Sequence, residues 1–224
     1  MRPVPRASLF FSRSGILGAV KTVELRRNSQ WNKASAGLSD AGLRLVEAGR
    51  EHLGGAYHAY YASPSRRCRA TLRALGFATY LEDKHFGRLP KWFYRFRTGL
   101  SPKGSAGVPF LEAYLSDTEA RERLLAHGAS VLDRVRRAAR RVPDGGRALV
   151  MTHLLTIELA AMMARGDENP AAIGAEIRPL EGVALELDSE DRVVAVRPLR
   201  LPDDLFAALD TSAPPDEPPP VPTS

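Results

Sequence analysis

The sequence has one cysteine and no long apolar run, and each absence excludes a class of protein. Cys68 has no second cysteine to pair with inside the chain, which excludes an internal disulfide and a metal site built from several cysteines. No apolar stretch approaches the ~20 residues that a bilayer-spanning helix needs. The five histidines are far apart and form no His-x-His or His-x-x-x-His pair; they stand at positions 52, 58, 85, 127 and 153. We therefore expect no metal, no other cofactor and no membrane partner.

The composition is that of an ordinary globular protein. Of 224 residues, 44% are hydrophobic and 26% are charged, which fits one α/β domain. The first twenty residues carry three arginines and no acid, but Arg13 breaks their apolar stretch and no cleavage site follows. We therefore expect a cytoplasmic protein, with an organelle presequence as the open alternative. We expect an N-terminal extension over 1–19, the domain over 20–200 and a disordered proline-rich tail over 211–224.

The net charge of +6 raises the question of a nucleic-acid partner. The arginines are scattered, and the densest group is Arg134, Arg136, Arg137, Arg140 and Arg141. This group ends a predicted helix, where cations interact favourably with the helix dipole. No aromatic-rich RNA motif or zinc finger accompanies it. Nucleic-acid binding therefore stays the remote alternative.

Strand-like and helix-like segments alternate along the chain, which indicates a mainly parallel sheet with helices on both faces. We expect strands over 20–25, 57–62, 77–81 and 147–152, and a terminal hairpin over 183–187 and 192–197. We expect helices over 39–53, 64–75, 116–141 and 154–164, the first capped by Ser39 and the third opened by a capping box over 116–119. The segment 82–108 mixes aromatic and basic residues, and we expect a loop or a small helical insertion over one end of the sheet.

Polar residues follow three of the expected strands. Arg27-Asn28, Ser63 and His153 each come where a strand ends. In parallel sheets, ligands bind at the carboxyl ends of the strands. Segments that are distant in the sequence are therefore predicted to meet at one pocket.

The order of these segments resembles the histidine phosphatase superfamily, also called phosphoglycerate-mutase-like. The resemblance rests on Glu24-Leu25-Arg26-Arg27-Asn28-Ser29, on Leu38-Ser39-Asp40-Ala41-Gly42, on the stretch from Ser63 to Thr71, and on Thr152-His153. The family writes the third stretch roughly as Ser-Pro-x-x-Arg-Ala-x-x-Thr-Ala, and its first motif as Arg-His-Gly. The resemblance spans about residues 20 to 200. It implies an α/β fold and a ligand that carries a phosphoryl group, on a small molecule or a phosphoprotein.

The family's site residues carry over onto matching positions. In the family, two arginines and a second histidine bind the phosphate oxygens, which implies these roles for Arg27, Arg67 and His153. Arginine suits the role because its planar fork binds two oxygens at once. Ser29, next to the first motif, is a further substrate-binding candidate. The acid that protonates the leaving oxygen is expected at Glu82 or Asp83, with Glu112 as a third choice.

At the position where the family has its phosphate-accepting histidine, this sequence has Asn28. A second alignment, over Ser12-Arg13-Ser14-Gly15, also offers no histidine. The first hypothesis is therefore a protein that binds phosphate with reduced or no phosphatase activity. The alternative is an active phosphomonoester hydrolase or phosphotransferase, with a displaced nucleophile or with a histidine that was changed to asparagine by design. Ser29 would need a general base to serve as that nucleophile, and Cys68 is expected to be a packed side chain.

Overall fold

The sheet in the computed structural model has six strands in the order β5-β4-β6-β1-β7-β8. The structure describes residues 19–210, apart from 33, 88, 90–107 and 175. Strands β4, β5, β6 and β1 run parallel, whereas β7 and β8 are antiparallel additions at one edge. In chain order the sheet strands are β1 (Lys21–Arg27), β4 (Ala59–Ala62), β5 (Leu81–Glu82), β6 (Arg147–Thr152), β7 (Gly182–Leu187) and β8 (Val193–Leu199). The expected α/β fold with a mostly parallel sheet is confirmed.

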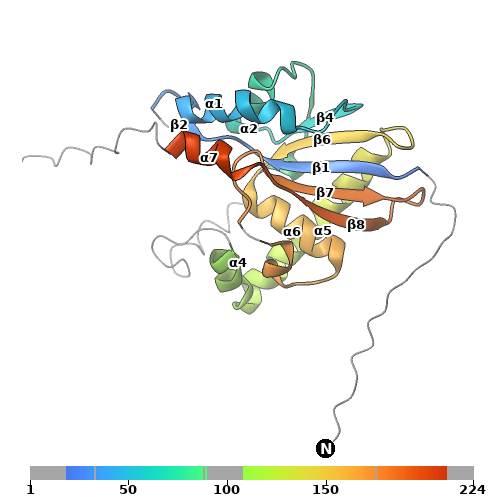
Figure 1. The fold of residues 1–224 in the computed structure, drawn as a ribbon. Coiled ribbons are helices and arrows are strands. Elements are labelled where there is room, and N and C mark those ends of the chain that lie inside the picture. Colours follow the sequence, from blue (N-terminus) through green and yellow to red (C-terminus); the bar gives the residue numbers. More distant parts are fainter. Residues whose placement is uncertain (1–18, 33, 88, 90–107, 175, 211–224) are drawn as a thin grey trace, which may run out of the picture.

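Helices cover both faces of this sheet (Figure 1). One face carries α5 and α6, with α4 beyond them, and the other carries α1, α2 and α7. The α-helices are α1 (Asp40–Gly49), α2 (Arg66–Ala74), α4 (Val108–Leu115), α5 (Thr118–Ala139), α6 (Leu154–Arg165) and α7 (Asp203–Asp210). The 3₁₀ turns are η1 (Arg50–His52), η2 (Lys84–Phe86) and η3 (Pro170–Ile173), and β2 (Trp31–Asn32) pairs with β3 (Gly37–Leu38) in a small separate hairpin.

The alternation of side chains along β1 builds a different core on each face. Val23 and Leu25 are fully buried in the cluster formed with α5 and α6. Glu24 and Arg26 point to the opposite face and are buried as an ion pair, with Arg26 Nε 2.9 Å from Glu24 Oε2. Tyr57 also donates its hydroxyl proton to Glu24, at 2.9 Å. The buried carboxylate is satisfied by these partners, as a buried charge must be.

The expected Ser39 cap is confirmed, whereas α2 begins at Arg66, two residues after its expected start, with a cap at Ser65 that was not predicted. Ser39 Oγ accepts a hydrogen bond from the backbone N–H of Gly42, and α1 begins at Asp40, directly after Ser39. In the same way, Ser65 Oγ accepts from the N–H of Cys68 at the start of α2. The capping box over 116–119 is wrong in detail, because Asp117 is the cap of α5 and accepts from Ala120 N–H at 2.8 Å.

The predicted strand over 77–81 is mostly wrong. Only Leu81 and Glu82 form β5. The Phe77 ring, at the start of the expected strand, packs on Tyr60 with ring centroids 4.5 Å apart. Phe77 therefore contributes to side-chain packing and lies outside the strand. The β2–β3 hairpin between β1 and α1 was not predicted, and neither were α4 and α7.

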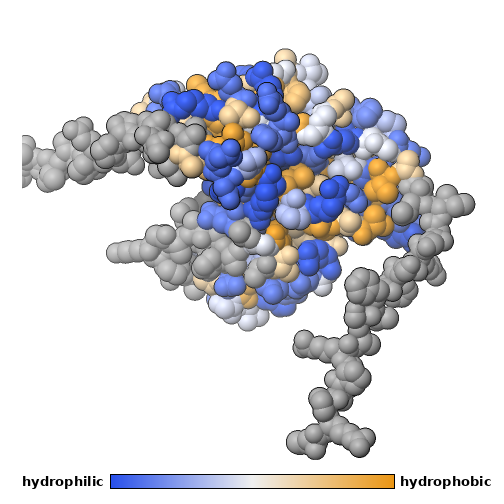
Figure 2. All heavy atoms as spheres, viewed as in Figure 1, coloured by the Kyte–Doolittle hydropathy of each residue, from blue (hydrophilic) through white to orange (hydrophobic). Residues whose placement is uncertain are grey.

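Several sequence expectations fall outside the described residues. These are the extension over 1–18, the second alignment over 12–15, most of the aromatic and basic segment over 82–108, and the tail over 211–224. In the described part of the chain, no helix is both long and apolar enough to cross a membrane. Hydrophilic residues cover most of the face in Figure 2.

Candidate functional site

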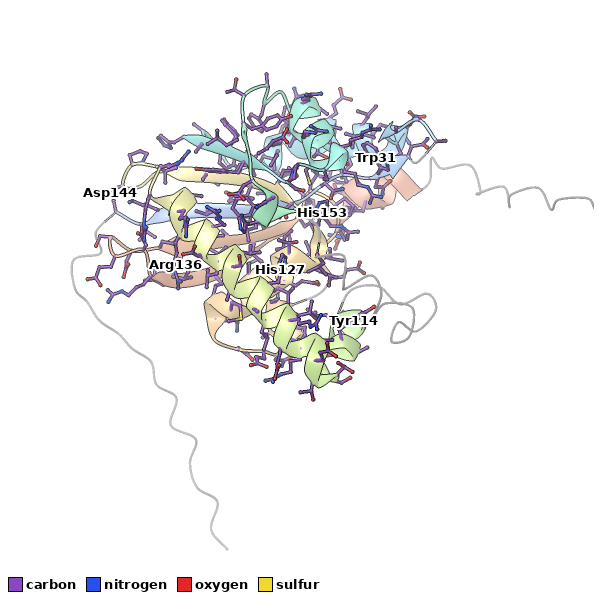
Figure 3. All side chains as sticks on the ribbon, turned by 180° about the vertical axis from the view of Figure 1, so that it is seen from behind. Trp31, Tyr114, His127, Arg136, Asp144 and His153 are labelled. Carbon is purple, nitrogen blue, oxygen red and sulfur yellow. The ribbon has the colours of Figure 1, made fainter. Side chains whose placement is uncertain are left out.

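The carboxyl ends of β1, β4 and β6 bring three distant segments together, as the sequence predicts. The backbone N–H of Asn28 donates to Thr152 O at 3.0 Å, and that of Ser63 donates to Met151 O at 2.9 Å. His153 follows Thr152 directly and stands at the N-cap of α6. The sheet therefore fixes the backbone positions of Asn28, Ser63 and His153 at one edge. Figure 3 shows His153 at this end of the sheet and Asp144 at the opposite end.

Four side chains at this edge form a contact cluster. His153 Nε2 lies 3.0 Å from Ser63 Oγ and 3.8 Å from Cys68 Sγ. The thiol also lies 3.9 Å from Asn28 Oδ1, so it stands between the amide and the imidazole. Asn28 uses its Nδ2 to donate to Ser29 O at 2.8 Å. Asn28 is thus held by its own backbone neighbour and borders a buried thiol.

A pocket of about 450 Å³ opens beside this cluster. Its size is typical of a small-molecule site. The residues that line it are Trp31, Ser63, Pro64, Ser65, Arg66, Arg67 and Gly87. Two of these are arginines, and none of the lining residues that the structure describes is an acid. The pocket is therefore suited to an anionic ligand.

Arg67 lies in this pocket with an unsatisfied hydrogen-bond donor. Its Nε is buried and has no hydrogen-bond partner, while its guanidinium carbon lies 5.9 Å from the centre of the Trp31 ring. A buried donor without a partner is costly, and an anion that accepts from it would remove the cost. Trp31 comes from the β2–β3 hairpin and lies with His153 toward the same end of the sheet in Figure 3.

Arg27, the other predicted phosphate ligand, is not among the residues that line the pocket. Its Nη1 donates to Ile177 O at 2.5 Å and lies 3.6 Å from the Glu176 carboxylate. Burial lowers the pKa of Arg27, and the charges of Glu176 and Glu158 oppose this shift. The structure therefore places Arg27 at the correct strand end but gives its guanidinium protein partners.

Glu158, on α6, is a buried carboxylate on the Arg27 side of the site. Its side chain is 3% exposed and its Oε2 has no hydrogen-bond partner. Burial raises the pKa of Glu158 to about 7, although the positive charge of Arg27 acts in the opposite direction. The carboxyl group is thus poised to change charge near neutral pH.

The three carboxylates proposed as the general acid lie outside the set that lines the pocket. Glu82 is exposed and lies 3.4 Å from Arg69 Nη1, and Glu112 is exposed on α4. Asp83 caps η2 and lies 2.8 Å from the His85 ring Nδ1. Burial alone would raise the pKa of Asp83, but the hydrogen bonds from His85 and the charge of Arg134 outweigh it and lower that pKa. Asp83 is therefore held in its charged form.

Ser29 joins the end of β1 to two helices. Its backbone N–H donates to Thr71 Oγ1 at 3.1 Å, and its hydroxyl donates to Gly42 O at 2.8 Å. Gly42 is needed for this approach, because a Cβ there would lie 2.4 Å from Gln30 O. Thr71, which fits the threonine of the family motif, thereby fixes the start of the loop after β1. A substrate-binding role for Ser29 stays a prediction.

Sequence reasoning missed part of the site. Ser63 was expected at the pocket only as a strand-end residue, and the contact of its hydroxyl with His153 was not predicted. The sequence did not indicate a role for Trp31, which is a single aromatic residue among polar ones. It did not indicate one for Arg66 either, which is a second arginine beside Arg67 in the motif. Glu158 had a signal that was not used, since a glutamate stands inside the apolar sequence of α6.

The basic cluster on α5 is largely paired with acids. Arg137 lies 2.8 Å from Asp133, Arg140 lies 2.5 Å from Asp191, and Arg134 lies 3.6 Å from Asp83. These pairs reduce the free positive charge that a nucleic acid would need. Within the described residues, no group of three or more His, Cys, Asp or Glu side chains is arranged to hold a metal ion.

Comparison with known proteins gives one family. The model of the histidine phosphatase superfamily (branch 1) matches residues 22–197. No curated protein matches the sequence.

Several solved structures share the fold at low identity. A phosphoserine phosphatase from Entamoeba histolytica, in complex with 3-phosphoglyceric acid, aligns with a TM-score of 0.57 at 10% identity, over 79% of this chain and 96% of that one. A phosphoglycerate mutase from Bacillus anthracis aligns with a TM-score of 0.53 at 14% identity, over 86% and 98%. A mycobacterial glucosyl-3-phosphoglycerate phosphatase aligns with a TM-score of 0.50 at 14% identity, over 73% and 92%.

Proposed function

Because the chain belongs to the histidine phosphatase superfamily (branch 1), we propose that it binds the phosphate group of a phosphorylated small molecule or phosphoprotein, with little or no phosphatase activity. The observation that carries the proposal is Arg67, which lines a pocket of about 450 Å³ and whose buried Nε lacks a hydrogen-bond partner. A phosphate oxygen would accept from this donor in a charge-assisted hydrogen bond. The similar phosphatases and mutase, named for phosphorylated compounds, support this ligand class.

The other positive features of the pocket favour the same ligand. Arg66 and Arg67 both line it, and the N-terminal end of α2, capped by Ser65, lies beside them. The backbone N–H groups at a helix start carry partial positive charge and favour anions. His153 is joined to this region through Ser63 at 3.0 Å.

The reduced activity follows from Asn28. In this proposal it takes the place of the phosphate-accepting histidine, and an amide nitrogen has no basic lone pair to attack phosphorus. Its Nδ2 proton is already donated to Ser29 O. Loss of a catalytic group costs factors on the order of 10³ to 10⁶ in rate, while binding by Arg67 does not depend on it.

A second candidate is an active phosphomonoester hydrolase or phosphotransferase, either with a displaced nucleophile or with a histidine replaced by design. The observation that favours a displaced nucleophile is the contact between Ser63 and His153. Both candidates use the same phosphate pocket, and they differ in whether a residue of the protein attacks the phosphorus.

Restoring the histidine separates the two candidates. Cys68 Sγ lies 3.9 Å from Asn28 Oδ1, so an imidazole at position 28 needs space that the thiol occupies. The variants to compare are therefore Asn28→His, Cys68→Ala and the double variant. We expect the wild type to bind inorganic phosphate in calorimetry and to turn over a panel of phosphomonoesters slowly or not at all.

We expect the double variant to gain at least about a thousandfold in turnover and to form phosphohistidine. Cys68→Ala alone controls for the added space and should bind phosphate as the wild type does. Fast turnover by the wild type would contradict the proposal, and so would a double variant that binds phosphate but never forms phosphohistidine. Failure of the wild type to bind phosphate would remove both candidates.

A further inference from the structure

Ser63 belongs to the contact cluster with His153, Cys68 and Asn28 and also lines the pocket. Its Oγ lies 3.0 Å from His153 Nε2, and the residue also lines the pocket that contains Arg67. A hydroxyl at hydrogen-bond distance from an imidazole is the arrangement in which a histidine activates a serine as a nucleophile. We propose that Ser63, with His153 as its general base, is a slow phosphoryl acceptor. The inference rests on the phosphate site of the proposed function.

The local backbone holds this pair in place. Ser63 follows β4, and its N–H donates to Met151 O on β6, so its position is fixed relative to the strand that leads into His153. The Ser65 N–H donates to Ser63 Oγ at 3.3 Å. That bond uses one lone pair of the hydroxyl and leaves its proton for His153. When the imidazole proton is on Nδ1, Nε2 accepts the Ser63 proton.

Neighbouring groups fit the acceptor role less well. The Cys68 thiol is 3.8 Å from His153 Nε2 but does not line the pocket. The Ser29 hydroxyl is donated to Gly42 O. Ser63 lines the pocket but is itself fully buried, which restricts the approach of a phosphate and makes the transfer slow.

The chemistry balances with a phosphomonoester and water alone. Ser63 Oγ attacks phosphorus, and the Oγ–P bond forms as the bond from phosphorus to the leaving alcohol oxygen breaks. The Ser63 proton passes to His153 Nε2 and from there to the leaving oxygen, which departs as the alcohol. Water then attacks the phosphorus of phosphoserine, and the new P–O bond forms as the Ser63 Oγ–P bond breaks. His153 accepts the water proton and passes it to Ser63 Oγ, and inorganic phosphate is released. Arg67 offsets the negative charge of the transferring group.

The test exploits the different acid stability of two phosphorylated residues. Phosphoserine survives acid, whereas phosphohistidine loses its phosphate. The full-length chain is incubated with radiolabelled acetyl phosphate, quenched in acid and digested, and the labelled residue is located by fragmentation mass spectrometry. We expect acid-stable label on Ser63, none in Ser63→Ala, and labelling slowed by about a hundredfold or more in His153→Gln. Ser189→Ala, in the β7–β8 turn, is the matched control and should label as the wild type does.

Calorimetry with inorganic phosphate on the same proteins separates this inference from the proposed function. Ser63→Ala should still bind phosphate, which also shows that it folds. Label that is acid-labile, label on Cys68 or another residue, or no label on a chain that binds phosphate would each overturn the role of Ser63 alone. Absence of both label and phosphate binding would overturn the phosphate site itself.

Discussion

Arg67 and Arg27 stand at the same edge of the sheet, yet their guanidinium groups have different surroundings. Arg67 lines the pocket, and its guanidinium carbon lies 5.9 Å from the centre of the Trp31 ring. Its buried Nε has no hydrogen-bond partner. Arg27 donates to the carbonyl of Ile177 and lies beside Glu176, with Glu158 close enough to oppose the shift in its pKa.

The comparison shows that an arginine at the correct strand end is not necessarily available to a ligand. The positive charge of Arg27 is largely balanced inside the protein, so a phosphate that approached it would have to compete with carboxylates. The donor of Arg67 has no such competitor. The two sides of the site therefore have separate roles in our proposal. The Arg67 side binds the anion, and the Arg27 side holds an arginine that is already paired with carboxylates of the protein.

The largest expected effect concerns the Arg27 side. Between pH 4.5 and about 7 the unfolded chain has released the Glu158 proton while the folded protein retains it. The folded state then binds more protons, so the free energy of unfolding falls as pH rises, by about 3 kcal/mol in total. Urea unfolding below pH 4.5 and above pH 7 measures this loss.

Glu158→Gln should remove most of that loss, whereas Glu47→Gln on the exposed side of α1 should leave it unchanged. Identical pH dependence in the wild type and in Glu158→Gln would show that the buried carboxyl group does not retain its proton. Glu158 would then not be a group that changes charge near neutral pH on the Arg27 side.

Removing each arginine tests the comparison directly. Arg67→Ala should weaken binding of inorganic phosphate by about 10- to 100-fold, since a hydrogen bond to a charged group contributes roughly 1.5–3 kcal/mol. Arg27→Ala should weaken it much less, because its guanidinium already has protein partners. Calorimetry on both variants, with Arg137→Ala on α5 as a control, gives the ratio. Equal losses would show that Arg27 leaves its partners when phosphate binds.

The smallest effect is expected at Trp31. Its ring lies 5.9 Å from the Arg67 guanidinium carbon and helps to hold that side chain at the pocket. A cation–π contact at a partly exposed site contributes about 0.5–1 kcal/mol, so Trp31→Ala should weaken phosphate binding by roughly two- to fivefold. Trp31→Phe keeps a ring and should lose less. An effect as large as that of Arg67→Ala would instead mean that the indole contacts the ligand.

Local patterns were enough to predict the fold and the meeting of three segments. The apolar sequence of β6 matches its prediction over 147–152, and Ser39 caps α1 as expected. Because parallel strands end at one edge, Asn28, Ser63 and His153 had to meet. The resemblance to the family added the ligand class.

Contacts between distant residues were beyond the reach of those patterns. Nothing near Arg27 in the sequence indicates that Glu176 would lie beside it. The ring of Phe77 packs on Tyr60, in a segment where a strand was expected. The unsatisfied donor of Arg67 depends on the pocket and not on its neighbours in the chain. The extension, the tail and the cytoplasmic location stay predictions.

The hydrogen bond from the Asn28 N–H to Thr152 O has a practical consequence. It fixes the main chain at position 28 independently of the side chain that the residue carries. Histidine, glycine or a synthetic amino acid introduced there would project from nearly the same point. With Cys68→Ala providing space, reactive groups can therefore be exchanged, or supplied as free imidazole to a glycine variant, from one backbone position. Position 28 is thus suited to chemical complementation, in which an added small molecule supplies the missing side chain.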